Sequence, residues 1–299
     1  MSIRVSFLGL GIDEMTPAEA VEKVQGLWRS RIKSRIFFVN AHCFNMAIID
    51  EQYRNSLGAA DLVLADGSGM LLASRLLRLP IQHNLNGTDL VPLLCGAAAE
   101  EGRSVFLLGA RPGVAERAAA RLQEGYPGLR IAGIQHGYFA SEESEEIISR
   151  INAAKPDMLL VAMGVPLQEQ WITDHITALD VPVSLAVGAL LDFFSNTVPR
   201  APRLFRQLGI EWIYRLSREP RRLWRRYMVG NVTFLSRVLL ALVTSEAMLP
   251  APQMLHNASV DGGASITGIV ELPQLARMTP EQEEEVAMAG VLAPASGTR

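Results

Sequence analysis

The chain has 299 residues, of which 49% are hydrophobic and 20% charged, and its formal net charge is -3. This is the composition of a globular protein with a sizeable core, and the near-neutral charge gives no support to a nucleic-acid-binding role. The cysteines, Cys43 and Cys95, form no CxxC pair, so we expect neither a disulfide framework nor a zinc site, and a reducing cytoplasm fits. We also expect no signal peptide and no membrane-spanning run, which needs about 18 apolar residues.

Short apolar segments alternate with helical segments as far as Val187. A capping box at Thr16 and Glu19 predicts a helix that runs to about Ser30. Alternation of this kind is typical of a parallel, doubly wound sheet with right-handed crossovers. We therefore predict an α/β fold, a Rossmann-like and mostly parallel sheet flanked by helices, over residues 1–198. The expected strands are residues 5–8, 36–39, 62–65, 105–108, 131–134, 158–163 and 183–187.

Asp66 is the first candidate for chemistry. It follows the apolar strand 62–65 directly and begins the turn Asp66-Gly67-Ser68-Gly69. Ligands of open α/β sheets bind beyond the carboxyl ends of the strands. A carboxylate walled by apolar strand ends can have a raised pKa and act as a general base. The alternative is that Asp66 caps the next helix or shapes the turn.

Other polar side chains follow strands in the same way. Asn40 either hydrogen-bonds a ligand or fixes a turn, and for His42 we favour the turn. For the stretch before the helix that ends near residue 100, one interpretation is that Thr88 or Asp89 caps the helix, and the functional alternative is a close backbone approach to a ligand at Gly87. Gln168 either reads a base or sugar edge with its amide or is a surface residue in the first turn of a helix.

The character of the chain changes near Thr197. Between Arg200 and Arg237 ten arginines stand against only Glu211 and Glu219, with no lysine or aspartate, which gives the segment a net charge of +8. Arginines and apolar residues keep to different helix faces, a pattern that favours a membrane-surface element over an oligomer interface or a nucleic-acid patch. We predict an arginine-rich, membrane-associating helical appendage over residues 199–245 and a disordered tail over residues 246–299.

Taken together, several stretches resemble the WecG/TagA/CpsF family of glycosyltransferases, glycosyltransferase family 26. Each stretch is unspecific alone, but their number and order make the resemblance strong over residues 3–240. The matching stretches are AADLVLADGSG (59–69), NGTDL (86–90), FLLGARPG (106–113), PDMLLVAMGVPLQEQW (156–171), VGALLDF (187–193) and RAP (200–202), followed by residues 209–214 and 218–220.

The resemblance implies a Rossmann-like domain with a C-terminal appendage, the GT-E type of fold. It also implies inverting transfer of glucose, N-acetylmannosamine or N-acetylmannosaminuronate from a UDP-sugar to a polyprenyl-diphosphate-linked sugar in surface polysaccharide synthesis. Such an enzyme is cytoplasmic and peripheral on the inner face of the bacterial cell membrane. A homo-oligomer is compatible with this expectation.

The resemblance also assigns roles to residues. Asp66 matches the base, Gln168 the nucleotide-contacting amide, Asp192 an acidic position near the uridine, and Asn40 the strand-end motif. Asn84 stands where related members often carry an arginine near a substrate phosphate, and Thr88 lies in the neighbouring motif. The arginines that contact the donor diphosphate are expected among Arg215, Arg218, Arg222 and Arg225.

The chain has no Asp-x-Asp motif to hold a divalent metal, so we expect no metal or other cofactor. Arginine can compensate the diphosphate charge instead, because its planar fork matches phosphate oxygens. The main alternative is a non-catalytic nucleotide-sugar-binding subunit of a polysaccharide assembly complex. An NAD-dependent oxidoreductase is disfavoured because Gly9-Leu10-Gly11 lacks the third glycine of the dinucleotide fingerprint.

Overall fold

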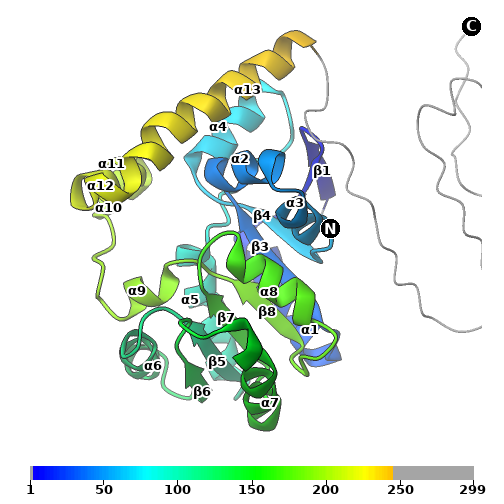
Figure 1. The fold of residues 1–299 in the computed structure, drawn as a ribbon, viewed down its shortest axis with the longest axis vertical. Coiled ribbons are helices and arrows are strands. Elements are labelled where there is room, and N and C mark those ends of the chain that lie inside the picture. The colour runs from blue at the N-terminus through cyan, green and yellow to red at the C-terminus, as the bar shows by residue number, and fades with distance from the viewer. Residues whose placement is uncertain (1–2, 245–299) are drawn as a thin grey trace, which may run out of the picture. The chain divides into compact units, whose positions relative to one another are not determined.

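A computed structural model describes residues 3–244, apart from the side chains of Arg203, Gln207 and Arg222. The predicted tail, residues 246–299, lies outside this range. At the centre of the described part is a six-stranded parallel sheet with strand order β4-β3-β8-β7-β5-β6 (Figure 1). Its strands are β3 (Ser34–Val39), β4 (Leu62–Ala65), β5 (Ser104–Gly109), β6 (Arg130–Gln135), β7 (Met158–Ala162) and β8 (Val183–Ala186). The predicted parallel α/β sheet is therefore confirmed.

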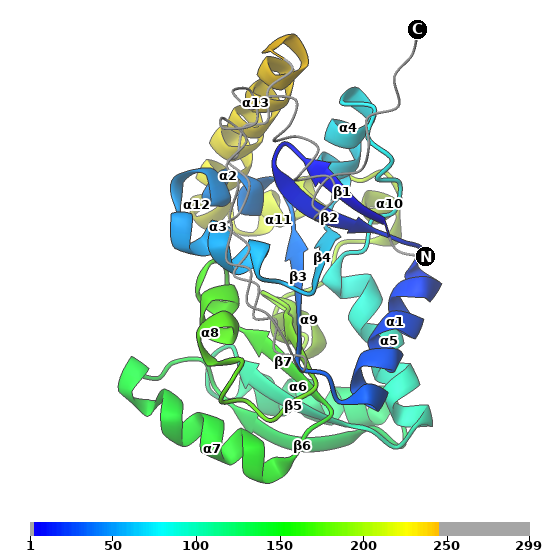
Figure 2. The ribbon, with the colours of Figure 1, turned by 90° about the vertical axis from the view of Figure 1, so that its right-hand side faces the viewer.

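Two layers of helices cover the two faces of the sheet (Figure 2). Successive strand residues point to opposite faces, so Ile36 and Phe38 enter one core, and Phe37 and Val39 enter the other. The first core is covered by α1 (Pro17–Ser30), α5 (Gly87–Glu100), α6 (Val114–Gly125) and α9 (Leu190–Phe194). The second is covered by α2 (Ala41–Ile49), α3 (Glu51–Gly58), α7 (Ser144–Ala154), which follows η1 (Ser141–Glu143), and α8 (Leu167–His175).

The first predicted strand exists but lies outside the main sheet. β1 (Ile3–Phe7) pairs antiparallel with β2 (Leu10–Glu14), which the sequence analysis did not predict. Leu8 and Gly9, with φ of +51° and +95°, form the two-residue turn of this hairpin. The buried Asp13 accepts hydrogen bonds from Arg4 and from the backbone N–H of Val63 in β4, at 3.0 and 2.8 Å. The hairpin thereby satisfies polar groups at the β4 edge of the sheet.

The predicted capping box of α1 is present, with the Thr16 hydroxyl and the Glu19 carboxylate each bonding the other's backbone N–H. Between β3 and β4 the chain forms two helices, α2 and α3, rather than one. Asp50 causes the break, because its backbone is extended and its carboxylate accepts a hydrogen bond from the N–H of Tyr53 to cap α3.

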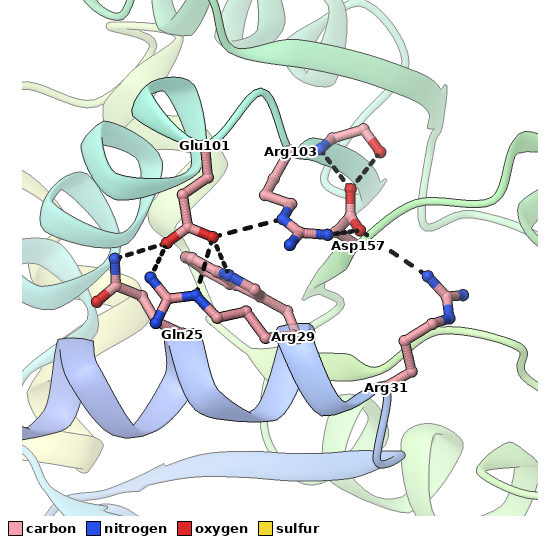
Figure 3. A network of polar contacts seen from close by, with 8 residues as sticks. Gln25, Arg29, Arg31, Glu101, Arg103 and Asp157 are labelled. Atoms are coloured by element: carbon pink, nitrogen blue, oxygen red, sulfur yellow. Dashed lines mark hydrogen bonds and ion pairs between the residues drawn. The ribbon is translucent and has the colours of Figure 1, made fainter.

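A network of polar side chains attaches α1 to the residues that precede strands β5 and β7, at the amino ends of the strands (Figure 3). Glu101 accepts hydrogen bonds from Gln25 at 2.9 Å, from the buried indole N–H of Trp28 at 3.0 Å and from Arg29 at 2.5 Å. Arg103 links this carboxylate to Asp157, with distances of 3.5 and 3.3 Å. The hydrogen bond from Arg29 is the main cause of the lowered pKa of Glu101.

We expect Glu101→Ala to destabilise the protein, because it leaves the buried indole N–H of Trp28 without its partner. The cost of such a group is about 1 to 3 kcal/mol. Glu100→Ala, a change of an exposed neighbour on the same helix, should have little effect. Since the pKa of Glu101 is lowered on folding, its contribution is present above the ordinary glutamate pKa and lost as the pH falls through the folded value. Urea titrations of both variants at neutral and acidic pH measure the difference, and equal unfolding free energies would contradict the assignment.

The appendage continues from α9 as a chain of helices. They are α10 (Arg203–Gln207), α11 (Glu211–Arg218), α12 (Pro220–Trp224), the π-helical η2 (Arg225–Val229) and α13 (Gly230–Thr244). Pro220 begins α12, where its fixed φ suits the first helical position. The described residues belong to one compact unit, and the division at residue 198 stays a prediction based on composition.

One face of α13 packs on the α/β part of the chain. Phe234 stacks on Phe7 of the hairpin and meets the edge of Phe44 in α2, with ring centroids 6.2 and 5.6 Å away. Asn45 donates a hydrogen bond to the carbonyl of Gly230 at 2.8 Å and accepts one from Arg237 at 2.6 Å. The appendage is thus attached through aromatic packing and paired polar groups.

The helix formed by η2 and α13 together bears on the expectation that no segment could span a bilayer. Residues Arg225–Thr244 form a continuous helix of 20 residues whose most apolar window has a mean hydropathy of 1.5, with 17% of that window buried. By length and composition alone it could cross a membrane. The segment holds no uninterrupted run of about 18 apolar residues, because a few polar residues interrupt it, but its average hydropathy is that of a spanning helix.

Candidate active site

Asn40 and Asp66 meet at the carboxyl edge of the sheet. Val39 and Ala65 lie in register on the neighbouring strands β3 and β4, so the residues that follow them are adjacent. The side-chain amide of Asn40 donates a hydrogen bond to Oδ2 of Asp66 at 3.1 Å, and its oxygen accepts from the N–H groups of His42 and Cys43 to cap α2. Asn40 therefore both fixes the turn and holds the candidate base.

The surroundings of Asp66 give its carboxylate the properties of a base. Burial raises the pKa of Asp66 above its ordinary value, against the lowering effects of the Asn40 hydrogen bond and of the positive charges of Arg226 and Arg215. A carboxylate with a raised pKa takes up a proton more readily than an exposed one. The neighbouring His42 is neutral at neutral pH, because burial, assisted by Arg226, lowers its pKa to about 4.

The turn after Asp66 is held from both sides. Gly67, with φ of +92°, donates its backbone N–H to Oδ1 of Asn84 at 2.7 Å and begins α4 (Ser68–Leu76). Ser68 donates its hydroxyl to the carbonyl of Gly209 in the appendage at 2.6 Å. A Cβ on Gly209 would lie 2.9 Å from Cβ of Ser68, so the close approach requires glycine. Asn84 thus supports the turn that follows Asp66. The predicted contact of Asn84 with substrate stays a prediction.

Thr88 connects the first turn of α5 to the start of the appendage. Asn86 caps this helix, so the expected cap by Thr88 or Asp89 was wrong. The Thr88 hydroxyl donates to Oδ1 of Asn86 at 2.6 Å and accepts from Arg200 at 3.0 Å. Arg200 also pairs with Asp89 at 2.5 Å, and Arg206 lies 3.9 Å from the same carboxylate. Thr88 therefore ties Arg200 of the appendage to α5, and its predicted contact with substrate stays a prediction.

Gln168 lies inside the protein, with 2% of its surface exposed, so the surface-residue alternative was wrong. Its Oε1 accepts from the N–H of Gly164, after β7, at 3.2 Å and from the N–H of Gly188, after β8, at 2.9 Å. Its amide nitrogen donates to Glu169 at 2.8 Å, and burial raises the pKa of Glu169 to about 7. Gln168 thereby joins the two turns that border the site, and Asp192 follows the second of them in α9.

The appendage arginines occupy different environments. The Arg215 guanidinium lies 5.3 Å from the ring centroid of Phe193, beside Asp192, and its charge acts on Asp66. Arg218 and Arg225 are exposed, and Arg225 stacks on the exposed ring of Trp224 at 5.4 Å. The side chain of Arg222 lies outside the described residues. Among the four arginines predicted to contact the donor diphosphate, Arg215 is therefore the one whose charge acts on Asp66, the candidate base.

Two residues of this cluster were missed by the sequence analysis. Arg226 was assigned only to the polar face of the appendage, yet its charge acts on both Asp66 and His42. Glu211 was counted only as a charge, yet it is partly buried beside Arg200 and Arg215, and burial raises its pKa. The sequence offers no periodic signal for Arg226, because the helix break at Pro220 and the π-helical turn change the face on which it lies. Among the described residues no group of three or more histidine, cysteine, aspartate or glutamate side chains is arranged to hold a metal ion.

Removing the Asn40 amide is expected to raise the pKa of Asp66 further, because its hydrogen bond favours the charged carboxylate. If Asp66 is the base, the acidic limb of the rate profile of both Asn40→Ala and Asn40→Ser moves to higher pH. Serine still caps α2, so only the alanine variant should lose about 1 kcal/mol of stability. Rate–pH profiles and thermal melts separate the two effects, and an unshifted limb in both variants would contradict the coupling.

The fold places a carboxylate of raised pKa at the carboxyl edge of a parallel sheet, with two arginines whose charges act on it, as a catalytic site would require. Comparison with known proteins shows that the chain is a glycosyltransferase. Residues 5–247 match the model of the family described as Glycosyl transferase WecG/TagA/CpsF family. The chain belongs to the WecG/TagA/CpsF family, and the resemblance found in the sequence is confirmed.

Similar proteins occur in Staphylococcus aureus. Those of strains MW2 and NCTC 8325 are each 35% identical to this chain over 224 residues, which cover 74% of this chain and 87% of the relative. Both are named N-acetylglucosaminyldiphosphoundecaprenol N-acetyl-beta-D-mannosaminyltransferase. These relatives therefore act on a sugar carried by a polyprenyl diphosphate.

Proposed function

We propose that the chain transfers an N-acetylmannosaminyl group from a UDP-sugar to a sugar linked to polyprenyl diphosphate, with Asp66 as the general base. The acceptor and the transferred sugar are supported by the names of the relatives. The single observation that supports the mechanism best is the place of Asp66, a partly buried carboxylate at a strand end that accepts a hydrogen bond from Asn40 at 3.1 Å, and the charges of Arg215 and Arg226 act on it.

The proposed reaction is a direct displacement. The acceptor hydroxyl oxygen attacks the anomeric carbon of the donor and gives its proton to Asp66. The bond from that carbon to the diphosphate oxygen breaks, and UDP leaves with the bonding electrons. Inversion of an α-linked donor yields a β-linkage. Asn40 orients the base through the hydrogen bond to Oδ2, which leaves Oδ1 of Asp66 to accept the proton.

Negative charge develops on the leaving diphosphate and needs compensation. Arg215 and Arg226 come from α11 and η2 and act on the same carboxylate, so the donor diphosphate would lie between them and Asp66. Arginine presents a rigid fork of donors to phosphate oxygens. In this proposal the appendage completes the site, and no metal takes part.

We further propose that the enzyme lies on the inner face of the cell membrane. α13 exposes a row of aliphatic side chains, and Arg221 and Arg225 are exposed at its amino-terminal side. Its other face packs on the α/β part of the chain through Phe234 and Val238. A helix held by the enzyme along one side is suited to lie in the membrane interface, and this favours peripheral binding over a span.

The test is transfer by the purified full-length chain. Radiolabelled UDP-N-acetylmannosamine, UDP-N-acetylmannosaminuronate and UDP-glucose are each incubated with a short-chain polyprenyl-diphosphate-linked N-acetylglucosamine acceptor. We expect a labelled disaccharide lipid from the first donor. A product from another donor would correct the sugar, and binding of UDP-sugars without transfer or hydrolysis would favour the non-catalytic subunit.

A further inference from the structure

We propose that α4, the helix that begins two residues after Asp66, is a second membrane-contact element, contributed by the α/β part of the chain itself. The occupant of its outer face would be an anionic lipid surface. This inference rests on the proposed function only in that the acceptor is lipid-linked. It assigns a membrane role outside the arginine-rich appendage.

The exposed face of α4 combines aliphatic and basic side chains. Leu72 and Leu76 are 53% and 38% exposed, and Arg75 and Arg78 are exposed beside them. The opposite face is buried through Met70, Ala73 and Ser74. Since one side of α4 is buried and two leucines are exposed on the other, α4 has an apolar surface that no other described element covers.

The position of α4 favours a lipid as the occupant. α4 packs against α13, and both views place the two helices at the same end of the described residues (Figures 1 and 2). The outer face of α13 is also aliphatic. Its most exposed aliphatic residues are Val232, Leu239, Leu240 and Val243, at 68%, 50%, 53% and 85%. α4 is thus in contact with the helix already proposed to meet the membrane.

The charges point the same way. No aspartate or glutamate occurs between Gly67 and Leu85, nor between Pro220 and Thr244. Each arginine near an anionic leaflet raises the partition coefficient about fivefold. Two elements far apart in the sequence thus both lack acidic residues, as a surface that meets an anionic leaflet requires. Because α4 begins directly after the base, its contact with lipid would hold Asp66 close to the membrane surface where the acceptor resides.

The experiment measures co-sedimentation of the full chain with phosphatidylglycerol and with phosphatidylcholine vesicles. The double variant Leu72→Glu/Leu76→Glu is compared with Leu93→Glu, which alters a leucine of α5 that is 51% exposed and packs with the other helix layer. We expect the double variant to bind phosphatidylglycerol vesicles about tenfold or more weakly and the control to bind within about twofold of the parent. Thermal melts establish that both variants are folded.

A second measurement reports insertion directly. Both native cysteines are buried, so a polarity-sensitive fluorophore attaches selectively to a cysteine introduced by Leu72→Cys or by Leu93→Cys. We expect the emission at position 72 to shift to the blue on addition of phosphatidylglycerol vesicles and that at position 93 to stay unchanged. Unchanged binding of the double variant together with no shift at position 72 would overturn the proposal.

Two further outcomes are distinguishable. If the double variant instead dissociates an oligomer in analytical ultracentrifugation without changing vesicle binding, the surface joins copies of this chain and the lipid proposal fails. Transfer to a short-chain, water-soluble acceptor should be unaffected in the double variant. Absence of that transfer in the parent chain would count against the proposed function and leave the vesicle result to stand on its own.

Discussion

Asp66→Asn is expected to lower kcat for sugar transfer by about 10²- to 10⁴-fold, the contribution of a positioned general base. The amide can still accept a hydrogen bond from Asn40 but cannot take the proton of the acceptor hydroxyl. Binding of the donor should change little, since the diphosphate is proposed to lie on the arginines. Rapid-quench single-turnover assays measure the chemical step, and calorimetric titration with UDP measures binding.

The matched control is Asp174→Asn, a change of an exposed aspartate in α8. It should transfer sugar at the parent rate. If Asp66→Asn retained the parent rate under single-turnover conditions, the general base would have to be another group, and the role assigned to the strand end would be wrong.

Arg215→Gln is expected to lower kcat by about 10²- to 10³-fold, as the loss of one group that stabilises the developing charge does in other sites. Arg218→Gln, three residues later on the same helix and exposed, should change kcat by less than about threefold, because an exposed charge is screened by solvent. The comparison separates a specific contact from the general positive charge of the appendage. Steady-state kinetics of the two variants, with UDP release as the readout, make the measurement.

Arg215→Lys should recover only part of the rate, since lysine supplies a point charge without the planar fork. Equal rates for the glutamine variants of Arg215 and Arg218 would show that the structure does not single out Arg215. In that case the leaving group would depend on Arg226 or on an arginine whose side chain lies outside the described residues.

The sheet could be predicted because its signals are local. Short apolar runs bounded by turns, such as residues 62–65 and 183–187, indicate buried strands, and the capping box at Thr16 fixes a helix start within four residues. The strand-end positions of Asn40 and Asp66 follow from the same periodicity. Their direct contact follows once the two strands are parallel neighbours.

The features that escaped prediction depend on contacts between distant residues. The hairpin strand β2 carries the buried Asp13, whose partner Val63 lies 50 positions away, so its place at the β4 edge of the sheet could not be predicted from the residues around it. Likewise, the burial of Gln168 depends on turns after two different strands.

The different environments of the appendage arginines also depend on contacts between distant residues. Ten of them share one segment, and composition predicts a basic surface for all. Only the contact of Arg215 with Phe193 of α9 and the π-helical turn at Arg225–Val229 distinguish Arg215 and Arg226 from their exposed neighbours. A helix wheel drawn through the break at Pro220 assigns the faces wrongly.

The pH dependence of the single-turnover rate tests the central claim most directly, because it joins the carboxylate to the appendage. In the parent chain we expect the rate to fall on acidification with an apparent pKa above the ordinary aspartate value, as burial of Asp66 requires. Arg215 lowers that pKa, so the acidic limb of Arg215→Gln should lie at higher pH than that of the parent. A limb that stays in place in Arg215→Gln, or that persists unchanged in Asp66→Asn, would contradict the account.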